Sequence, residues 1–242
     1  MSEPEDPLDL LHQIEASEGE RVSRHLRPLQ VTGRIFTMNA QELQETLTAF
    51  NRPPLVFQLW AVDNRELFQE YYGEVIRHLH NFLASASTLA DHVNAVVGKL
   101  YSDQSFESEY RRKVSESFKS SGLATFVQDL RNYMLHKGLP PTTARLSSEA
   151  CSGTVRNAVY LNKGALLNWE SWSSRSREFM AALPADLDLL EVVISYKEIV
   201  NSFYAWLHQR LQEIHEPDLK GLEDLELRFN AARGSGTARD SE

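Results

Sequence analysis

The chain has 242 residues, 42% of them hydrophobic and 24% charged, which is enough for one large domain or for a domain with extensions. No run approaches the roughly 18 consecutive apolar residues of a membrane span. The acidic segment 2–6 lacks the basic and apolar regions of a signal peptide, so we expect a cytoplasmic protein that does not contact membranes. The single cysteine, Cys151, excludes a disulfide framework within the chain and a cysteine-based zinc site.

The first sixty residues predict two helices around a short strand. Apolar residues at helical spacing indicate a helix over 7–26 that is broken or weakened near Gly19. Residues 31–38 are rich in β-type side chains and favour a strand. Asn39 is a good N-cap for a helix that continues to about Phe50 and ends before the two prolines at 53–54.

The middle of the chain predicts three helices and a hairpin. Asp63 or Asn64 caps the longest helix, in which apolar residues recur every three or four positions. A second helix is expected over 104–120 and a third over 123–136, the latter ended by Gly138 and the prolines at 140–141. Small polar and β-branched residues around Gly153 predict a two-stranded hairpin near 146–161.

Helical patterns return over 169–182 and 187–214, and the polar chain after Pro217 is expected to be frayed or disordered. The predicted fold class is therefore mostly α, a helical bundle with a small β-hairpin insertion. We divide the chain into an N-terminal helical extension (1–62), a helical domain (63–215) and a polar tail (216–242).

The net charge of −9 argues against a general affinity for nucleic acid, but the charge is unevenly distributed. Residues 109–163 hold nine basic and four acidic side chains, a net charge of +5, so the rest of the chain carries −14. A local excess of cations of this kind can hold a phosphate on an otherwise acidic protein.

The spacing Arg-x4-His occurs twice, at Arg131 and His136 and again at Arg210 and His215. The second occurrence lies in acidic surroundings at the end of an amphipathic helix, and we interpret it as surface decoration. The first ends a predicted helix, has Asn132 directly after the arginine and runs into a His-Lys-Gly-Leu-Pro sequence.

The segment LRNYMLH at 130–136 resembles the motif of the HEPN superfamily of bacterial nucleotide-binding and ribonuclease domains, in which an arginine precedes a histidine by four to six residues. The expected order of elements is also similar, over about 63–215: a long helix, a second helix, the motif helix, a hairpin ending in Val-Tyr-Leu at 159–161 and a closing helix with Ser-Phe-Tyr-Ala-Trp at 202–206. The resemblance implies a metal-independent endoribonuclease that leaves a 2′,3′-cyclic phosphate. It further implies a homodimer in which the two motifs face a shared cleft. The biological role that it implies is that of a toxin, with a separate antitoxin protein as partner, or of a phage-defence effector.

The residue types suit this chemistry. His136 titrates near neutral pH and can move a proton to or from RNA, and a helix C-terminus favours its charged form. Arg131 offers a planar charged fork for phosphate oxygens. Asn132 lies one turn before His136 and can orient the imidazole or the phosphate. These three are the candidate catalytic residues, with Lys137 and Tyr133 as candidate substrate-binding residues.

One geometric difficulty is visible in the sequence. On an ideal helix Arg131 and His136 lie about 140° apart, whereas Asn132, Tyr133 and His136 share a face. Either the arginine side chain bends round, or the helix loosens before Gly138, or a second subunit completes the site.

Two simpler interpretations stay open. Arg131 could be an ion-pair partner on the helix surface while His136 caps the helix end, or the domain could be a non-catalytic dimeric interaction or nucleotide-binding module. No metal or other cofactor is expected, because His78 and His80 point to opposite faces of a helix and His208 and His215 lie roughly 10 Å apart on theirs.

Overall fold

The computed structural model describes residues 5–52, 55–102, 105–148 and 155–237. By its internal contacts the chain divides into two compact units, one formed by Met1–Val31 with Tyr204–Glu242 and the other by Thr32–Phe203. Two long helices, α2 (Glu18–Phe50) and α9 (Leu189–Thr237), contribute residues to both units. These limits differ from the 1–62, 63–215 and 216–242 division that the sequence suggested.

The first unit begins with α1 (Pro7–Ala16), which starts where Asp6 accepts a hydrogen bond from the backbone N–H of Leu8. The helical chain breaks at Ser17, whose hydroxyl accepts from the N–H of Glu20 and so caps the start of α2. The predicted break near Gly19 is therefore confirmed, two residues before the glycine, and Gly19 itself has another role. A Cβ atom there would lie 2.3 Å from the carbonyl oxygen of Asp218, so the glycine permits α2 to approach α9 closely.

The end of α9 corrects one prediction. The chain was expected to fray after Pro217, yet the helix contains this proline and continues to Thr237. Leu211, His215 and Leu222 are buried at helical spacing on either side of it. Burial of this stripe outweighs the loss of one backbone hydrogen bond at the proline. Near the far end, Arg228 forms an ion pair with Glu5.

In the second unit, two predictions were wrong: residues 31–38 do not form a strand, and Asn39 is not an N-cap, because both lie inside helix α2. The helix is continuous to Phe50, and the amide of Asn39 donates to the carbonyl oxygen of Ile35 within it. The physical reason is the spacing of its buried residues, which fits a helix and overrides the β preference of 31–38. These residues are Phe36, Ala40, Leu43, Leu47 and Phe50.

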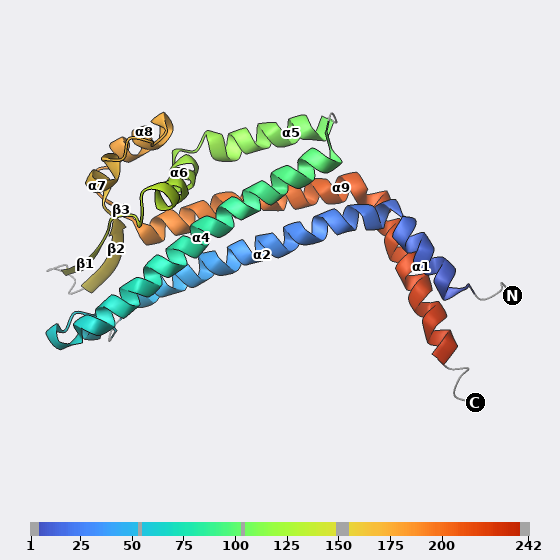
Figure 1. Ribbon diagram of the computed structural model, residues 1–242, viewed down its shortest axis with the longest axis horizontal. Helices are drawn as coiled ribbons and strands as arrows, with labels where there is room; N and C mark the ends of the chain where they lie inside the picture. The colour runs from blue at the N-terminus through green and yellow to red at the C-terminus, as the bar shows by residue number, and fades with distance from the viewer. Residues whose placement is uncertain (1–4, 53–54, 103–104, 149–154, 238–242) are drawn as a thin grey trace. The chain divides into compact units, whose positions relative to one another are not determined.

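The core of this unit lies between helices. After α3 (Leu55–Leu59) and the short η1 (Val62–Asn64), helix α4 (Arg65–Leu100) runs alongside α2 (Figure 1). The start of α4 confirms Asn64 as its N-cap residue, although the Asn64 amide donates to the carbonyl of Gln58 rather than capping the helix. The longest helix is α9, with 49 residues against 36 in α4, so that prediction was wrong. The rings of Phe36, Phe82 and Tyr196 join α2, α4 and α9, with centroids 5.8–6.2 Å apart.

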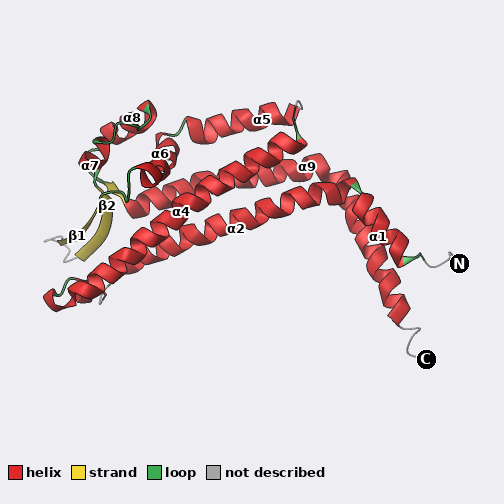
Figure 2. Cartoon of the chain, in the orientation of Figure 1, coloured by secondary structure: helices red, strands yellow, loops and turns green. Residues whose placement is uncertain are grey.

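The remaining helices are α5 (Ser105–Val114), a π-helical turn η2 (Ser115–Lys119), α6 (Gly122–His136), α7 (Lys163–Leu167) and α8 (Ser174–Ala182). Helices α6, α7 and α8 lie with the sheet at one end of the second unit, whereas α5 lies beside the C-terminal part of α4 (Figure 1). The sheet, yellow in Figure 2, has the order β1 (Thr142–Ser148), β2 (Val155–Leu161), β3 (Leu187–Asp188), with antiparallel neighbours. The predicted hairpin is confirmed, although the turn around Gly153 lies outside the described residues.

The two-residue strand β3 was not expected. It pairs with the end of β2, and the acidic residues around it hold the hairpin through ion pairs from Arg145 to Asp186 and from Arg156 to Asp188. The fold class is nevertheless the one that the sequence predicted: mostly α with a small β insertion. Within the described part of the chain, no helix has the length and apolarity that crossing a membrane requires.

Candidate functional site at the end of helix α6

Helix α6 has well-defined ends. At its start the hydroxyl of Ser121 accepts from the N–H of Ala124, and Gly122 allows the close approach of Phe179 on α8, whose Cβ would lie 3.0 Å from an added methyl group. At its other end Gly138 adopts a φ of +133°, a conformation that side chains with a Cβ rarely adopt. The prediction that the helix ends at His136, before Gly138, is confirmed.

Backbone hydrogen bonds cap the C-terminal end of α6. The carbonyl oxygen of Tyr133 accepts from the N–H groups of both Lys137 and Gly138, at 2.8 and 3.2 Å. The cap is therefore made by the main chain, and the imidazole of His136 is left exposed at the end of the helix.

Arg131 and Asn132 lie close together in one chain. Both are half-buried, and Nη1 of Arg131 lies 3.4 Å from Oδ1 of Asn132, the distance of a weak hydrogen bond. The helix keeps its α-helical form through His136, so it does not loosen before Gly138. The second of the three arrangements that the sequence left open, a helix that loosens before Gly138, is therefore not the one observed.

Tyr133 has a packing position. Its side chain is buried, with its ring stacked on Trp172 (centroids 5.8 Å apart, 18° between planes) and in edge contact with Trp169 (5.3 Å, 80°). The structure therefore places this candidate substrate-binding residue inside an aromatic cluster rather than on the surface.

The aromatic cluster and a carboxylate attach α6 to the chain between α7 and α8. Trp172 also stacks on Phe126, two turns before Tyr133, with centroids 5.5 Å apart. Between these two residues lies Asp129, which accepts hydrogen bonds from the hydroxyls of Ser173 and Ser176, both at 2.6 Å. Sequence reasoning missed these partners. The pair of tryptophans three residues apart, Trp169 and Trp172, was the visible signal.

Four of the nine basic side chains of the segment 109–163 form ion pairs with carboxylates of the described chain. Arg111 pairs with Glu107, Arg112 with Glu116, Arg145 with Asp186 and Arg156 with Asp188. The ammonium group of Lys163 donates to the carbonyl oxygen of Leu183.

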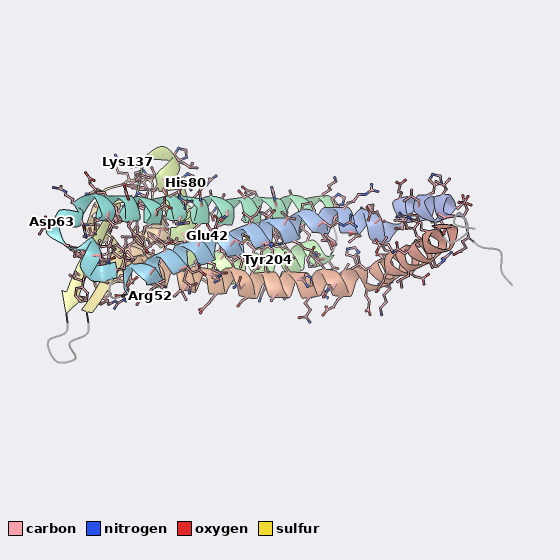
Figure 3. All side chains as sticks on the ribbon, turned by 90° about the horizontal axis from the view of Figure 1, so that it is seen from below. Glu42, Arg52, Asp63, His80, Lys137 and Tyr204 are labelled. Atoms are coloured by element: carbon pink, nitrogen blue, oxygen red, sulfur yellow. The ribbon has the colours of Figure 1, made fainter. Side chains whose placement is uncertain are left out.

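Two cations at the end of α6 differ from these four, and so does the exposed Lys119 before the helix. Among the residues that the structure describes, neither Arg131 nor Lys137 forms an ion pair with a carboxylate. Lys137 is exposed at the outer end of the helix (Figure 3), and the flanking Leu135 and Leu139 are exposed by 55% and 66%. Arg131 of the motif and the adjacent Lys137 are therefore among the cations of the basic segment that no carboxylate of the described chain neutralises.

The second Arg-x4-His occurrence is not simple surface decoration. His215 is buried, and its Nδ1 lies 3.2 Å from a carboxylate oxygen of Asp218. Arg210 forms an ion pair with Glu213. This histidine is therefore a packing residue of the first unit, whereas His136 is exposed.

Within the described ranges, no group of three or more His, Cys, Asp or Glu side chains is arranged to hold a metal ion. His78 instead lies between two carboxylates, with ring nitrogens 3.4 Å from Glu42 and 3.8 Å from Glu74. Comparison of the chain with models of protein families, with curated proteins and with solved structures gave no significant match.

Proposed function

We propose that the chain is a metal-independent endoribonuclease of the HEPN type, with its site at the end of α6. The observation that carries the proposal is the group of side chains at the end of α6, where an exposed histidine lies beside cations without a carboxylate partner in the described chain. His136 is exposed at the end of the helix, next to Lys137 and five residues after Arg131. Neither Arg131 nor Lys137 has a carboxylate partner in the described chain. A phosphate diester is a ligand that would supply the missing negative charge.

The proposed reaction is an internal transfer at phosphorus. The 2′-oxygen of a ribose attacks the adjacent phosphorus, its proton is removed, and the bond to the 5′-oxygen of the next nucleotide breaks as that oxygen gains a proton. The products are a 2′,3′-cyclic phosphate and a free 5′-hydroxyl, so no water is consumed in this step.

Each side chain has a role in this step. The imidazole of His136 carries one of the two protons. The guanidinium of Arg131 binds the phosphate oxygens, on which negative charge increases in the transition state. Asn132, which contacts the Arg131 guanidinium, orients it, and Lys137 adds positive charge at the entrance.

In the dimeric form of the proposal, a second copy of the chain supplies the other proton carrier. A two-fold axis would place the same helix end opposite itself, so two histidines and two arginines would face one phosphate. An RNA-cleaving homodimer of this kind would act as a toxin or a phage-defence effector in the cytoplasm, controlled by an antitoxin protein.

The test is incubation of purified protein with total RNA in excess EDTA, wild type beside His136→Ala. We expect cleavage by the wild-type protein alone, with 2′,3′-cyclic phosphate ends. Cleavage that requires added Mg²⁺, or that is equal in the two proteins, would mean that His136 does not perform the chemistry.

One observation favours a second function. Leu135 and Leu139 are exposed on both sides of His136, and exposed apolar side chains of this size are common in protein interfaces. A non-catalytic dimerisation module would use this surface without any cleavage of RNA. Under that alternative the same incubation leaves the RNA intact, while Leu139→Asp makes a dimeric protein monomeric.

A further inference from the structure

We infer that Trp169 is a stacking surface for a base of single-stranded RNA whose phosphate lies at the end of α6. The inference rests on the proposed function for the identity of the ligand, and it assigns to Trp169 the role that the sequence analysis gave to Tyr133. It also specifies the class of substrate, an RNA strand with unpaired bases.

The position of Trp169 along α6 follows from its neighbours. Phe126 and Tyr133 lie seven residues apart on one face of the helix, and the ring of Trp172 contacts both. Of these two rings, Trp169 contacts only that of Tyr133. Trp169 is therefore displaced toward the C-terminal end of α6. The next side chains on that face of the helix, three and four residues after Tyr133, are His136 and Lys137.

The segment that carries Trp169 is firmly held. The guanidinium of Arg177 donates hydrogen bonds to the carbonyl oxygens of Trp169, Glu170 and Trp172, at 3.2, 2.6 and 3.4 Å. The indole N–H of Trp172 donates to the carbonyl of Leu166 at 2.6 Å. A ring on such a segment is already ordered before a ligand arrives, so binding costs little conformational entropy.

The ring of Trp169 is partly exposed, and the aromatic rings that contact it are not stacked on it. Trp169 is half-buried, and both of its ring contacts are edge contacts, at 80° to Tyr133 and 88° to Trp172. Within the described residues no aromatic ring lies parallel to it. The rings of Tyr133 and Trp172, by contrast, are stacked on each other and buried.

An aromatic ring beside unpaired cations is the combination that binds single-stranded nucleic acid. The cations hold the phosphate, and every base can stack on the ring whatever its identity. In a duplex the base faces are covered by their neighbours, so this arrangement selects a single strand.

The experiment measures binding apart from cleavage. All variants carry His136→Ala so that the probe stays intact, and the probe is a fluorescein-labelled single-stranded oligoribonucleotide of mixed sequence, followed by fluorescence anisotropy. We expect Trp169→Leu, which retains apolar bulk but no aromatic face, to raise Kd roughly five- to hundredfold. Trp169→Phe should stay within about threefold of its parent, because the ring face is preserved.

The matched control is Trp60→Leu. Trp60 is exposed by 39% and also makes an edge contact with a neighbouring ring, that of Phe68, but it lies between α3 and η1. Its replacement should leave Kd unchanged, and a duplex of the same sequence should bind far more weakly than the single strand. Thermal unfolding of each variant separates a loss of stacking from a loss of fold.

The outcomes distinguish this inference from the proposed function. An unchanged Kd for Trp169→Leu, equal losses for the leucine and phenylalanine variants, or no binding of the single strand by the parent protein would each overturn the stacking role. If the single strand binds through Trp169 but wild-type protein cleaves no RNA, the stacking role stands and the nuclease proposal fails. If wild-type protein cleaves RNA and Trp169→Leu binds normally, the reverse holds.

Discussion

One carboxylate oxygen of Asp129 accepts hydrogen bonds from both the backbone N–H and the hydroxyl of Ser173, at 3.1 and 2.6 Å. Ser173 is the N-cap residue of α8, so the carboxylate of α6 lies at the positive end of that helix. A third bond comes from Ser176, whose side chain is fully buried. Asp129 thus joins the motif helix to α8, beside the packing of Phe126 on Phe179.

Replacement of Asp129 by alanine should destabilise the protein by about 2–3 kcal/mol, because it removes hydrogen bonds to a charged group. It also leaves the buried Ser176 hydroxyl without the carboxylate to which it donates. Urea unfolding measures this loss. Gln128→Ala, on the exposed side of the same helix, is the control and should change stability little. Equal effects of the two substitutions would show that Asp129 does not hold α6 to α8.

Gly138 and Gly73 form a matched pair for testing the end of α6. A Cβ atom would meet nothing within 4 Å at either position, but only Gly138 has a positive φ. We expect Gly138→Ala to lower the free energy of unfolding by about 1–2 kcal/mol through backbone strain. Gly73→Ala, within α4, should instead raise it by about 0.5–1 kcal/mol. Changes of the same sign at both positions would contradict this account.

The limits of α6 could be predicted because they depend on local chemistry. Gly138 supplies the positive φ that ends the helix, and the prolines that follow cannot continue it, whatever the rest of the chain does. The hairpin was predictable for a similar reason, since β-branched residues surround a glycine.

Residues 31–38 show where local preference misleads. Their side chains favour a strand, but the burial of Phe36 and Ala40 four residues apart requires a helix, and tertiary packing decides between the two. The third strand was missed because two residues carry no periodic signal.

The elements that pack on the motif helix could not be predicted from the sequence, for another reason. Periodicity shows that one face of α6 is apolar, but it does not show which element covers that face. Tyr133 looked available to a substrate until Trp169 and Trp172, more than thirty residues later, were found packed on it.

In the proposed nuclease, Arg131→Ala and His136→Ala should each lower RNA cleavage by at least about a hundredfold while the protein stays folded, since each removes a group needed in the transition state. Cleavage of a labelled RNA, with circular dichroism as the test of folding, checks this. The controls are Arg210→Ala and His208→Ala, because His208 is exposed whereas His215 is buried. Similar losses in controls and site variants would point to stability and remove the assignment.

The shared-site form of the proposal makes its own prediction. If two copies complete one site, a mixture of Arg131→Ala and His136→Ala proteins should recover part of the activity that each lacks alone. Light scattering at micromolar concentration decides the matter independently, because cleavage by a strict monomer excludes a shared site.

Asp186 should give the protein a measurable acid dependence. The N–H of Lys163 and then the guanidinium of Arg145 stabilise its carboxylate and hold its pKa below the ordinary value of 3.8. A carboxyl whose folded pKa is depressed contributes stability above its unfolded pKa and loses it as the pH falls through the folded one. Asp186→Asn should therefore be less stable at pH 7 by about 1 kcal/mol, a gap that closes below pH 3.8.

Urea unfolding of both proteins between pH 7 and pH 2 measures this dependence. Glu70→Gln, which changes an exposed carboxylate on α4, serves as the control. A constant gap between Asp186→Asn and wild type across the range would mean that the charge of Asp186 does not stabilise the hairpin.

The attachment of the hairpin to α2 bears on the order of folding. The buried side chain of Asn157 donates to the carbonyl oxygen of Phe50 at 2.8 Å, across 107 positions of the chain, and its N–H donates to the side chain of Asn51. Closing so long a loop costs entropy before these two bonds return any stability. We expect the hairpin to dock on α2 late in folding, after the helices between the two residues have assembled. The sheet end of the second unit is therefore the part that we expect to detach first when the native protein unfolds.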